Sequence, residues 1–362
     1  MRHPEWFLVL SLGTCLAFLI AGNAIEQTLS RPVTLALVFL WLFGVILGSA
    51  ICVVRQAESI AAFLGEPYGT LVLTLSVTFI EVASISAVML HGENNPTLVR
   101  ETLIAVVMII LNGMVGASLM VGAWKYGEQH YNLQGANAYL GVMIPLVVLA
   151  MIMPDYTVST AGPTLSRAQE TMLGVIMISL YLVFLAVQTG RHRGYFGTGE
   201  ENAKQEGEEP SRRSLPYSVV MLLLFIAPVV YLAEQLAKPI DYLIETLHAP
   251  AALGGVMIAI LVATPEAIGA VRAALANKVQ RSVNIFLGSV LSTMGLTVPA
   301  MLVISHWTNH PIVLGVEHAE MVLLLLTITL CVVTFSSGHT NVLQGVVHLL
   351  LFVTFLFLLV QG

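Results

Sequence analysis

Two glutamates, Glu81 and Glu266, stand inside long apolar segments of the sequence. On an α-helix, Glu81 lies about 15 Å beyond Leu71 and Glu266 about 18 Å beyond Gly254. The hydrocarbon core of a bilayer is about 30 Å thick, so both carboxyl groups are predicted near its middle. A carboxylate at that depth costs several kcal/mol, and an ionisable group there indicates a functional site. The alternative for each glutamate is a structural ion pair with an arginine or a cap at a kink.

Oxygen-bearing groups flank both glutamates. Thr78 comes one turn before Glu81, and Thr264 and Pro265 directly precede Glu266. Proline removes one helical hydrogen bond and frees a carbonyl oxygen. Carboxylates, hydroxyls and carbonyls together suit a hard cation such as Ca²⁺ or Na⁺, so Glu81 and Glu266 are predicted to be its metal ligands.

Polar side chains on the helices that follow are predicted to complete this cation- and proton-binding site. They are Asn112, Ser289 and Ser292. Small and polar residues also hold membrane helices together, which is the alternative role for these three.

Other acids fall near the ends of apolar segments and could form vestibules. Glu58 is expected in a cytoplasmic vestibule, and Glu234, Asp241 and Glu245 recur on one helix face that could line an outer entrance. Solvated interfacial acids are the competing interpretation.

The composition identifies the kind of protein that must carry these residues. Of 362 residues, 57% are hydrophobic and 10% are charged, with a net charge of −6. A soluble domain has about 25% charged residues, so a soluble enzyme is excluded. A nucleic-acid binder would need a basic surface. The three cysteines have no metal-binding spacing, and no cofactor is expected. The lipid bilayer is therefore the expected partner.

The predicted fold is an all-α polytopic membrane protein. Runs long enough to cross a bilayer give about eleven helices, at 6–22, 33–54, 69–91, 101–121, 137–153, 170–188, 217–236, 251–271, 283–304, 313–334 and 341–360. The first could instead be a signal peptide, although a retained helix is expected. All but Arg31, Arg100, Arg167 and Lys238 of the 15 basic residues fall on one side. That side is predicted to be cytoplasmic, with the N-terminus inside and the C-terminus outside.

The chain divides around one polar, acidic segment. We expect an N-terminal helix in 1–30, a first repeat in 31–190, an acidic cytoplasmic loop in 191–215 and a second repeat in 216–362. Five spans per half is an odd number, so the second half would enter the bilayer from the opposite side. Inverted repeats of this kind place a binding site near the midplane.

Several segments carry a resemblance to a known family. The glutamates end the segments "VTFIE" and "VATPE", and "NKVQRSVNIFLGSVLSTMGLTVP" follows the second. The chain resembles the cation/calcium exchanger superfamily, in particular its bacterial calcium/proton and sodium/proton antiporter branch of the ChaA type. That family carries Gly-Asn-x-x-Glu in each half, and Thr78 and Ala263 occupy the asparagine positions here. The resemblance implies one extra helix, two inverted five-helix repeats and secondary antiport.

The chemistry and the resemblance predict the same activity. Burial favours a protonated carboxyl and a nearby cation favours a charged one, so protons and cations compete for the two glutamates. The expected function is export of Ca²⁺, with Na⁺ or K⁺ as further cargo, against protons across a bacterial inner membrane. An antiporter for Na⁺ or K⁺ with little calcium transport, or a cation channel, are the alternatives. An enzyme is not expected, and assembly of several copies is left open.

Overall fold

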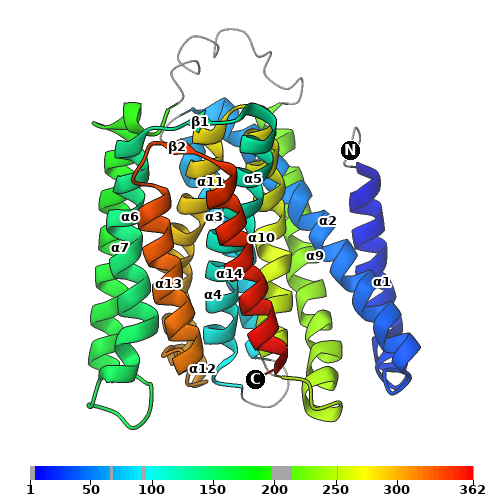
Figure 1. Cartoon of the computed structure of the whole chain (residues 1–362). Coiled ribbons are helices and arrows are strands. Elements are labelled where there is room, and N and C mark those ends of the chain that lie inside the picture. The colour runs from blue at the N-terminus through cyan, green and yellow to red at the C-terminus, as the bar shows by residue number, and fades with distance from the viewer. Residues whose placement is uncertain (1–4, 66–67, 91–94, 198–213, 251, 362) are drawn as a thin grey trace. The chain divides into compact units, whose positions relative to one another are not determined.

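The computed structural model describes residues 5–65, 68–90, 95–197, 214–250 and 252–361, and helices dominate it (Figure 1). The first half of the chain contains α1 (Glu5–Glu26), α2 (Pro32–Leu64), α3 (Tyr68–Met89), α4 (Leu98–Met108), the π turn η1 (Ile109–Met114), α5 (Val115–Tyr126), β1 (Gln129–His130), α6 (Leu133–Val147), η2 (Val148–Ile152), η3 (Met153–Tyr156), α7 (Arg167–Thr189) and η4 (Arg193–Tyr195). The second half contains α9 (Leu215–Asp241), η5 (Tyr242–Thr246), α10 (Ala252–Leu275), α11 (Val279–Ser292), the π turn η6 (Thr293–Thr297), α12 (Val298–Thr308), α13 (His318–Thr334), β2 (His339–Thr340) and α14 (Val342–Gln361).

Within the described residues, ten helical segments are long and apolar enough to cross a membrane. The eleventh predicted span is the shorter helix α13, which begins at His318 rather than at 313. Glu317 and Glu320 form a capping box there, which accounts for the later start. The all-α polytopic fold predicted from the sequence is confirmed.

Two compact units make up the chain, and each contains segments from both halves. Unit 1 comprises residues 1–98 and 209–265, and unit 2 comprises residues 99–208 and 266–362. Unit 1 therefore holds α1, α2, α3, α9 and the first part of α10, while unit 2 holds the rest of α10 and the remaining helices. The boundary inside α10 falls between Pro265 and Glu266.

When α1 is left aside, the third long helix of each half is interrupted by a π turn. The segment Leu98–Tyr126 contains η1, and the segment Val279–Thr308 contains η6. Both turns are largely buried in unit 2. A π turn adds one residue to a helical turn and often marks a functional position, because it redirects side chains without ending the helix.

A very short β-ribbon connects two distant segments of unit 2. Strands β1 and β2 pair antiparallel, with Gln129 opposite Thr340 and His130 opposite His339. Two-residue strands have no sequence periodicity, so the prediction of an all-helical chain missed them. The helices next to the ribbon, α5 and α14, run side by side (Figure 1). They cross at Gly116 and Gly345, where a Cβ on either glycine would come within 2.9 Å of the other's carbonyl oxygen.

Candidate functional site

The carboxylate of Glu266 is held by a hydroxyl from the next helix. Ser289 on α11 donates a hydrogen bond from Oγ to Glu266 Oε2, and the Ser289 side chain is buried whereas Glu266 is half-buried. Ser292, one turn further along α11, donates to the carbonyl oxygen of Ser289 at 2.9 Å. Unit 2 thus places Ser289 against Glu266 and Ser292 against Ser289, and the binding role of these three residues stays a prediction.

Glu81 lies in unit 1, on α3, and is 2% exposed. Thr78 and Ser84 stand three residues before and after it, so they are its neighbours along the helix surface. Their hydroxyl oxygens are buried, and neither has a hydrogen-bond partner in the described part of the chain. By contrast, Ser76 Oγ donates to its own helix, to the carbonyl oxygen of Val72 at 2.7 Å. A buried hydroxyl without a partner is costly, so these two oxygens are suited to a ligand or to water.

Asn112 occupies the middle of η1 and is fully buried. Its Nδ2 donates to Thr327 Oγ1 at 2.8 Å, and its Oδ1 lies 3.3 Å from His348 Nδ1. His348 Nε2 lies 3.0 Å from Thr334 Oγ1. These four side chains form one continuous polar chain inside unit 2, in which the Asn112 amide is oriented by its neighbours.

The sequence analysis assigned neither Thr327 nor His348 to the site. A signal for His348 was available, since it is an ionisable residue inside the last apolar segment. Thr327 carried no signal, because an isolated threonine in an apolar helix usually bonds to its own backbone.

The Thr264 hydroxyl donates to its own helix, to the carbonyl oxygen of Ile260. Pro265 cannot donate a backbone hydrogen bond, so it leaves the Leu261 carbonyl without its usual helical partner. The oxygen atoms available around this turn are therefore the Leu261 carbonyl oxygen and the Glu266 carboxylate, rather than the Thr264 hydroxyl.

The acids expected to form vestibules all belong to unit 1. Glu58 on α2 and Glu234 on α9 are exposed, and Asp241 at the end of α9 is half-buried. Glu245 falls in η5, but its side chain lies outside the described residues. The vestibule role of all four stays a prediction.

An ion-pair cluster that the sequence analysis did not foresee lies at the start of α4. Arg100 is 6% exposed and binds Glu101, which is 5% exposed, through a short charge-assisted hydrogen bond. The same guanidinium contacts Glu317 Oε1 at 3.2 Å and donates to the Gly315 carbonyl oxygen at 3.3 Å. Arg100 therefore fastens α4 to the segment before α13 within unit 2.

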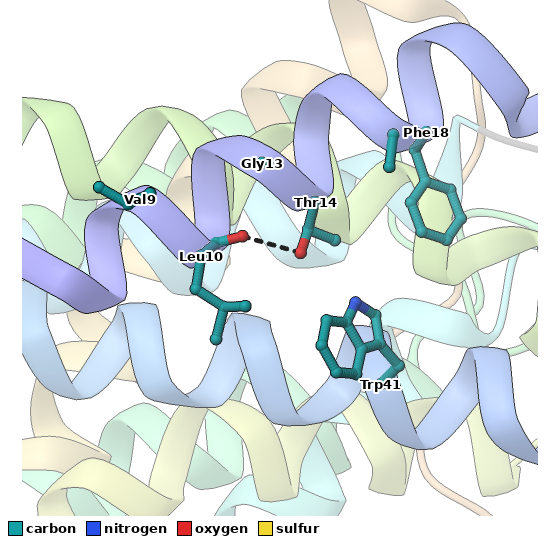
Figure 2. A pocket seen from close by; sticks show the side chains of 7 residues that line it. Val9, Leu10, Gly13, Thr14, Phe18 and Trp41 are labelled. Carbon is teal, nitrogen blue, oxygen red and sulfur yellow. Dashed lines mark hydrogen bonds between the residues drawn. The ribbon is translucent and has the colours of Figure 1, made fainter.

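An apolar pocket of about 520 Å³ lies between α1 and α2 in unit 1 (Figure 2). Leu10, Thr14, Phe18 and Trp41 are among its lining residues, and Thr14 Oγ1 donates to the Leu10 carbonyl oxygen at 2.9 Å. No carboxylate lines this pocket, so its chemistry is unlike that around the two glutamates.

Comparison with known proteins identifies the family. The family model described as sodium/calcium exchanger protein matches residues 6–190 and 217–361. The chain belongs to this family. The exchanger is 36% identical over 359 residues to the sodium-potassium/proton antiporter ChaA of Escherichia coli, covering 98% of this chain and 96% of that one. It is 26% identical over 297 residues to the Ca²⁺/H⁺ antiporter ChaA of Bacillus subtilis, covering 80% of this chain and 82% of that one.

Solved structures share the exchanger's fold. Native YfkE aligns with a TM-score of 0.76 at 21% identity, covering 98% of this chain and 100% of YfkE. The H⁺/Ca²⁺ exchanger CAX aligns with a TM-score of 0.69 at 12% identity, covering 98% of this chain and 88% of CAX. The resemblance predicted from the sequence is thereby confirmed, and the exchanger belongs to a family of membrane transporters rather than of enzymes.

Proposed function

We propose that this exchanger is a cation/proton antiporter in which Glu81 and Glu266 bind the cation and the protons in turn. The observation that carries this proposal is the pair of interior carboxylates, one in each half of the chain, each next to hydroxyl groups. Carboxylates with hydroxyl and carbonyl oxygens favour hard cations.

The coupling follows from the charge of the two glutamates. Two carboxylates balance one Ca²⁺, two monovalent cations or two protons, and each loaded form is nearly neutral. The form with two bare charges is costly in a low-dielectric interior. A transporter that changes sides only when loaded therefore exchanges cations for protons, and an inward proton gradient drives cation export.

The neighbours of each glutamate support its proposed role. The Ser289 hydroxyl stabilises the charged form of Glu266 by hydrogen bonding. Around Glu81, the oxygens of Thr78 and Ser84 are available for a bound cation or its water. Asn112 is included as a residue of the same site, with its amide oriented by Thr327 and His348.

Two cation classes have specific support. Ca²⁺ fits the charge balance of two glutamates and the printed name of the Bacillus subtilis relative. Na⁺ and K⁺ are favoured by the name of the Escherichia coli relative, which is the more similar of the two. We therefore propose that Ca²⁺, Na⁺ and K⁺ compete for Glu81 and Glu266, with monovalent antiport as the second candidate function.

The setting proposed for this activity is a bacterial inner membrane, with the N-terminus in the cytoplasm and the C-terminus outside. The two halves are proposed to be inverted repeats preceded by α1. The matching order of helices in the two halves, each with a π turn in its third long helix, supports this division. Each compact unit contains segments from both halves of the chain, which also supports this division. Assembly into a homo-oligomer is part of the same proposal.

The test is an exchange assay in everted membrane vesicles with an acid interior. Addition of Ca²⁺, Na⁺ or K⁺ should collapse the pH gradient in a saturable way, and the cation effective at the lowest concentration is the principal cargo. Glu81→Gln and Glu266→Gln should each abolish the collapse while the protein still inserts in the membrane. Glu128→Gln, a change at an exposed acid, is the matched control. Exchange retained in either glutamine variant would refute the proposal, and cation flux without proton movement would indicate a channel.

A further inference from the structure

Two histidines face each other across the short β-ribbon of unit 2. His130 on β1 is directly opposite His339 on β2, and their ring centroids are 6.3 Å apart. The Tyr131 amide donates to the Gly338 carbonyl oxygen at 3.0 Å, just beyond this pair. His130 and His339 therefore occupy a non-hydrogen-bonded position of the ladder, where opposite side chains share one face and approach most closely.

The protonation pattern of His339 is fixed by its backbone contact. His339 Nδ1 lies 3.0 Å from the carbonyl oxygen of Ser337. A carbonyl only accepts hydrogen bonds, so Nδ1 carries the hydrogen and Nε2 keeps its lone pair in the neutral ring. Metal-binding histidines commonly use this arrangement, in which one ring nitrogen donates to a carbonyl and the other binds the metal.

The other ring is accessible as well. His130 is exposed, and among the described residues its ring contacts His339 but makes no hydrogen bond. Both imidazoles can therefore turn a nitrogen lone pair toward the space between them without breaking an existing interaction.

We propose that His130 and His339 bind one divalent transition-metal ion of the Zn²⁺ or Ni²⁺ class. Imidazole nitrogens suit these ions, whereas Ca²⁺, Na⁺ and K⁺ prefer oxygen, so this site is distinct from the one that holds the transported cation. Within the described residues no group of three or more His, Cys, Asp or Glu side chains is placed to hold a metal. The ion is accordingly held by two protein ligands, and water completes its coordination.

The position of the pair gives the bound ion a structural effect. Strand β1 follows α5 and strand β2 leads into α14, and these two helices cross at Gly116 and Gly345. An ion between His130 and His339 links the ends of both helices. The bound ion is therefore suited to regulating how α5 and α14 pack in unit 2. This effect does not depend on which cation is transported.

The test uses the full chain, purified in detergent without a polyhistidine tag and treated with a chelator. Zn²⁺ titration by calorimetry at neutral pH should reveal one site per chain. His130→Gln and His339→Gln should each weaken binding by at least about tenfold, because each removes one of two ligands. His306→Gln, a change at an exposed histidine in the last turn of α12, should leave binding unchanged.

Two further readouts separate ligand loss from misfolding. Zn²⁺ should raise the unfolding temperature of the unsubstituted chain, because it binds the folded state, and it should have little effect on the two ribbon variants. Electron paramagnetic resonance with Cu²⁺ should show coupling to two imidazole nitrogens, and to one in each variant. The proposal is overturned if the unsubstituted chain does not bind Zn²⁺, or if both variants bind it with unchanged affinity.

Discussion

His348 on α14 lies 3.3 Å from Asn112 in the π turn η1, measured between His348 Nδ1 and Asn112 Oδ1. Asn112 Nδ2 donates to Thr327, so Oδ1 is the atom that faces the histidine and accepts its hydrogen. Thr334 is placed to donate to the remaining nitrogen, His348 Nε2, at 3.0 Å. The directions of these bonds are mutually consistent with one neutral tautomer, so His348 holds the orientation of the Asn112 amide.

Replacing His348 should affect both stability and cation affinity. We expect His348→Leu to lower the free energy of unfolding by about 1–3 kcal/mol, because buried groups of Asn112 and Thr334 lose their partner. It should also raise the KM for the cation. In His348→Gln the side-chain amide can still donate a hydrogen bond, so this variant should recover part of the lost stability and part of the lost cation affinity. Thermal unfolding and vesicle exchange kinetics measure the two effects, and an unchanged KM in His348→Leu would show that the histidine only packs.

Ser289→Ala should weaken cation binding by removing the hydroxyl that stabilises the charged Glu266. Hydrogen bonds to charged groups contribute about 1.5–3 kcal/mol, so an increase in KM of roughly tenfold or more is expected. Protons should then compete better, and the pH profile of exchange should move toward higher pH. Thr329→Val is the control, because Thr329 is exposed and its hydroxyl bonds to the Leu325 carbonyl of its own helix. An unchanged pH profile in Ser289→Ala would contradict the assignment.

Thr78→Val should lower cation affinity without lowering the stability of the protein. The Thr78 hydroxyl is buried without a hydrogen-bond partner among the described residues, so replacing it with a methyl group should leave stability unchanged or raise it by about 1–3 kcal/mol. If the oxygen serves a bound cation, the same change should lower cation affinity. Ser76→Ala, which removes a hydroxyl bonded to its own helix, provides the comparison on the same helix. Equal exchange kinetics in Thr78→Val and the unsubstituted chain would exclude Thr78 from the site.

The ion pairs of Arg100 should differ sharply in strength. Glu101→Gln removes the buried partner of a buried arginine and should cost about 3–5 kcal/mol of stability. Glu317→Gln removes a partner whose side chain is 71% exposed, and this change should cost at most about 1 kcal/mol. Thermal unfolding of the two variants at equal protein concentration compares them directly. Similar losses in both variants would mean that the buried Arg100–Glu101 pair contributes no more to stability than the exposed Arg100–Glu317 pair.

Much of this architecture could be predicted from the sequence, because apolar length and isolated charges are local signals. These signals were sufficient to predict the helices and the family, and to select Glu81 and Glu266 as candidate site residues. The contacts between distant segments were not accessible in the same way. The bond from His348 to Asn112 joins residues 236 apart in the chain, and that from Arg100 to Glu317 joins residues 217 apart. From the sequence, Arg100 is only one of the basic residues on the outer side, because nothing in the sequence reveals that Glu317 lies beside it.

The chain passes from unit 1 to unit 2 inside α10, at the peptide that joins Pro265 to Glu266. Proline interrupts the hydrogen bonding of the helix at this point, so the joint is the least reinforced turn of α10. Glu266 is therefore the first residue of α10 in unit 2, and its carboxylate comes directly after the turn that lacks this hydrogen bond. Under the proposed function, the carboxylate that binds the cation stands where the backbone of its helix can adjust with the smallest loss of hydrogen bonds.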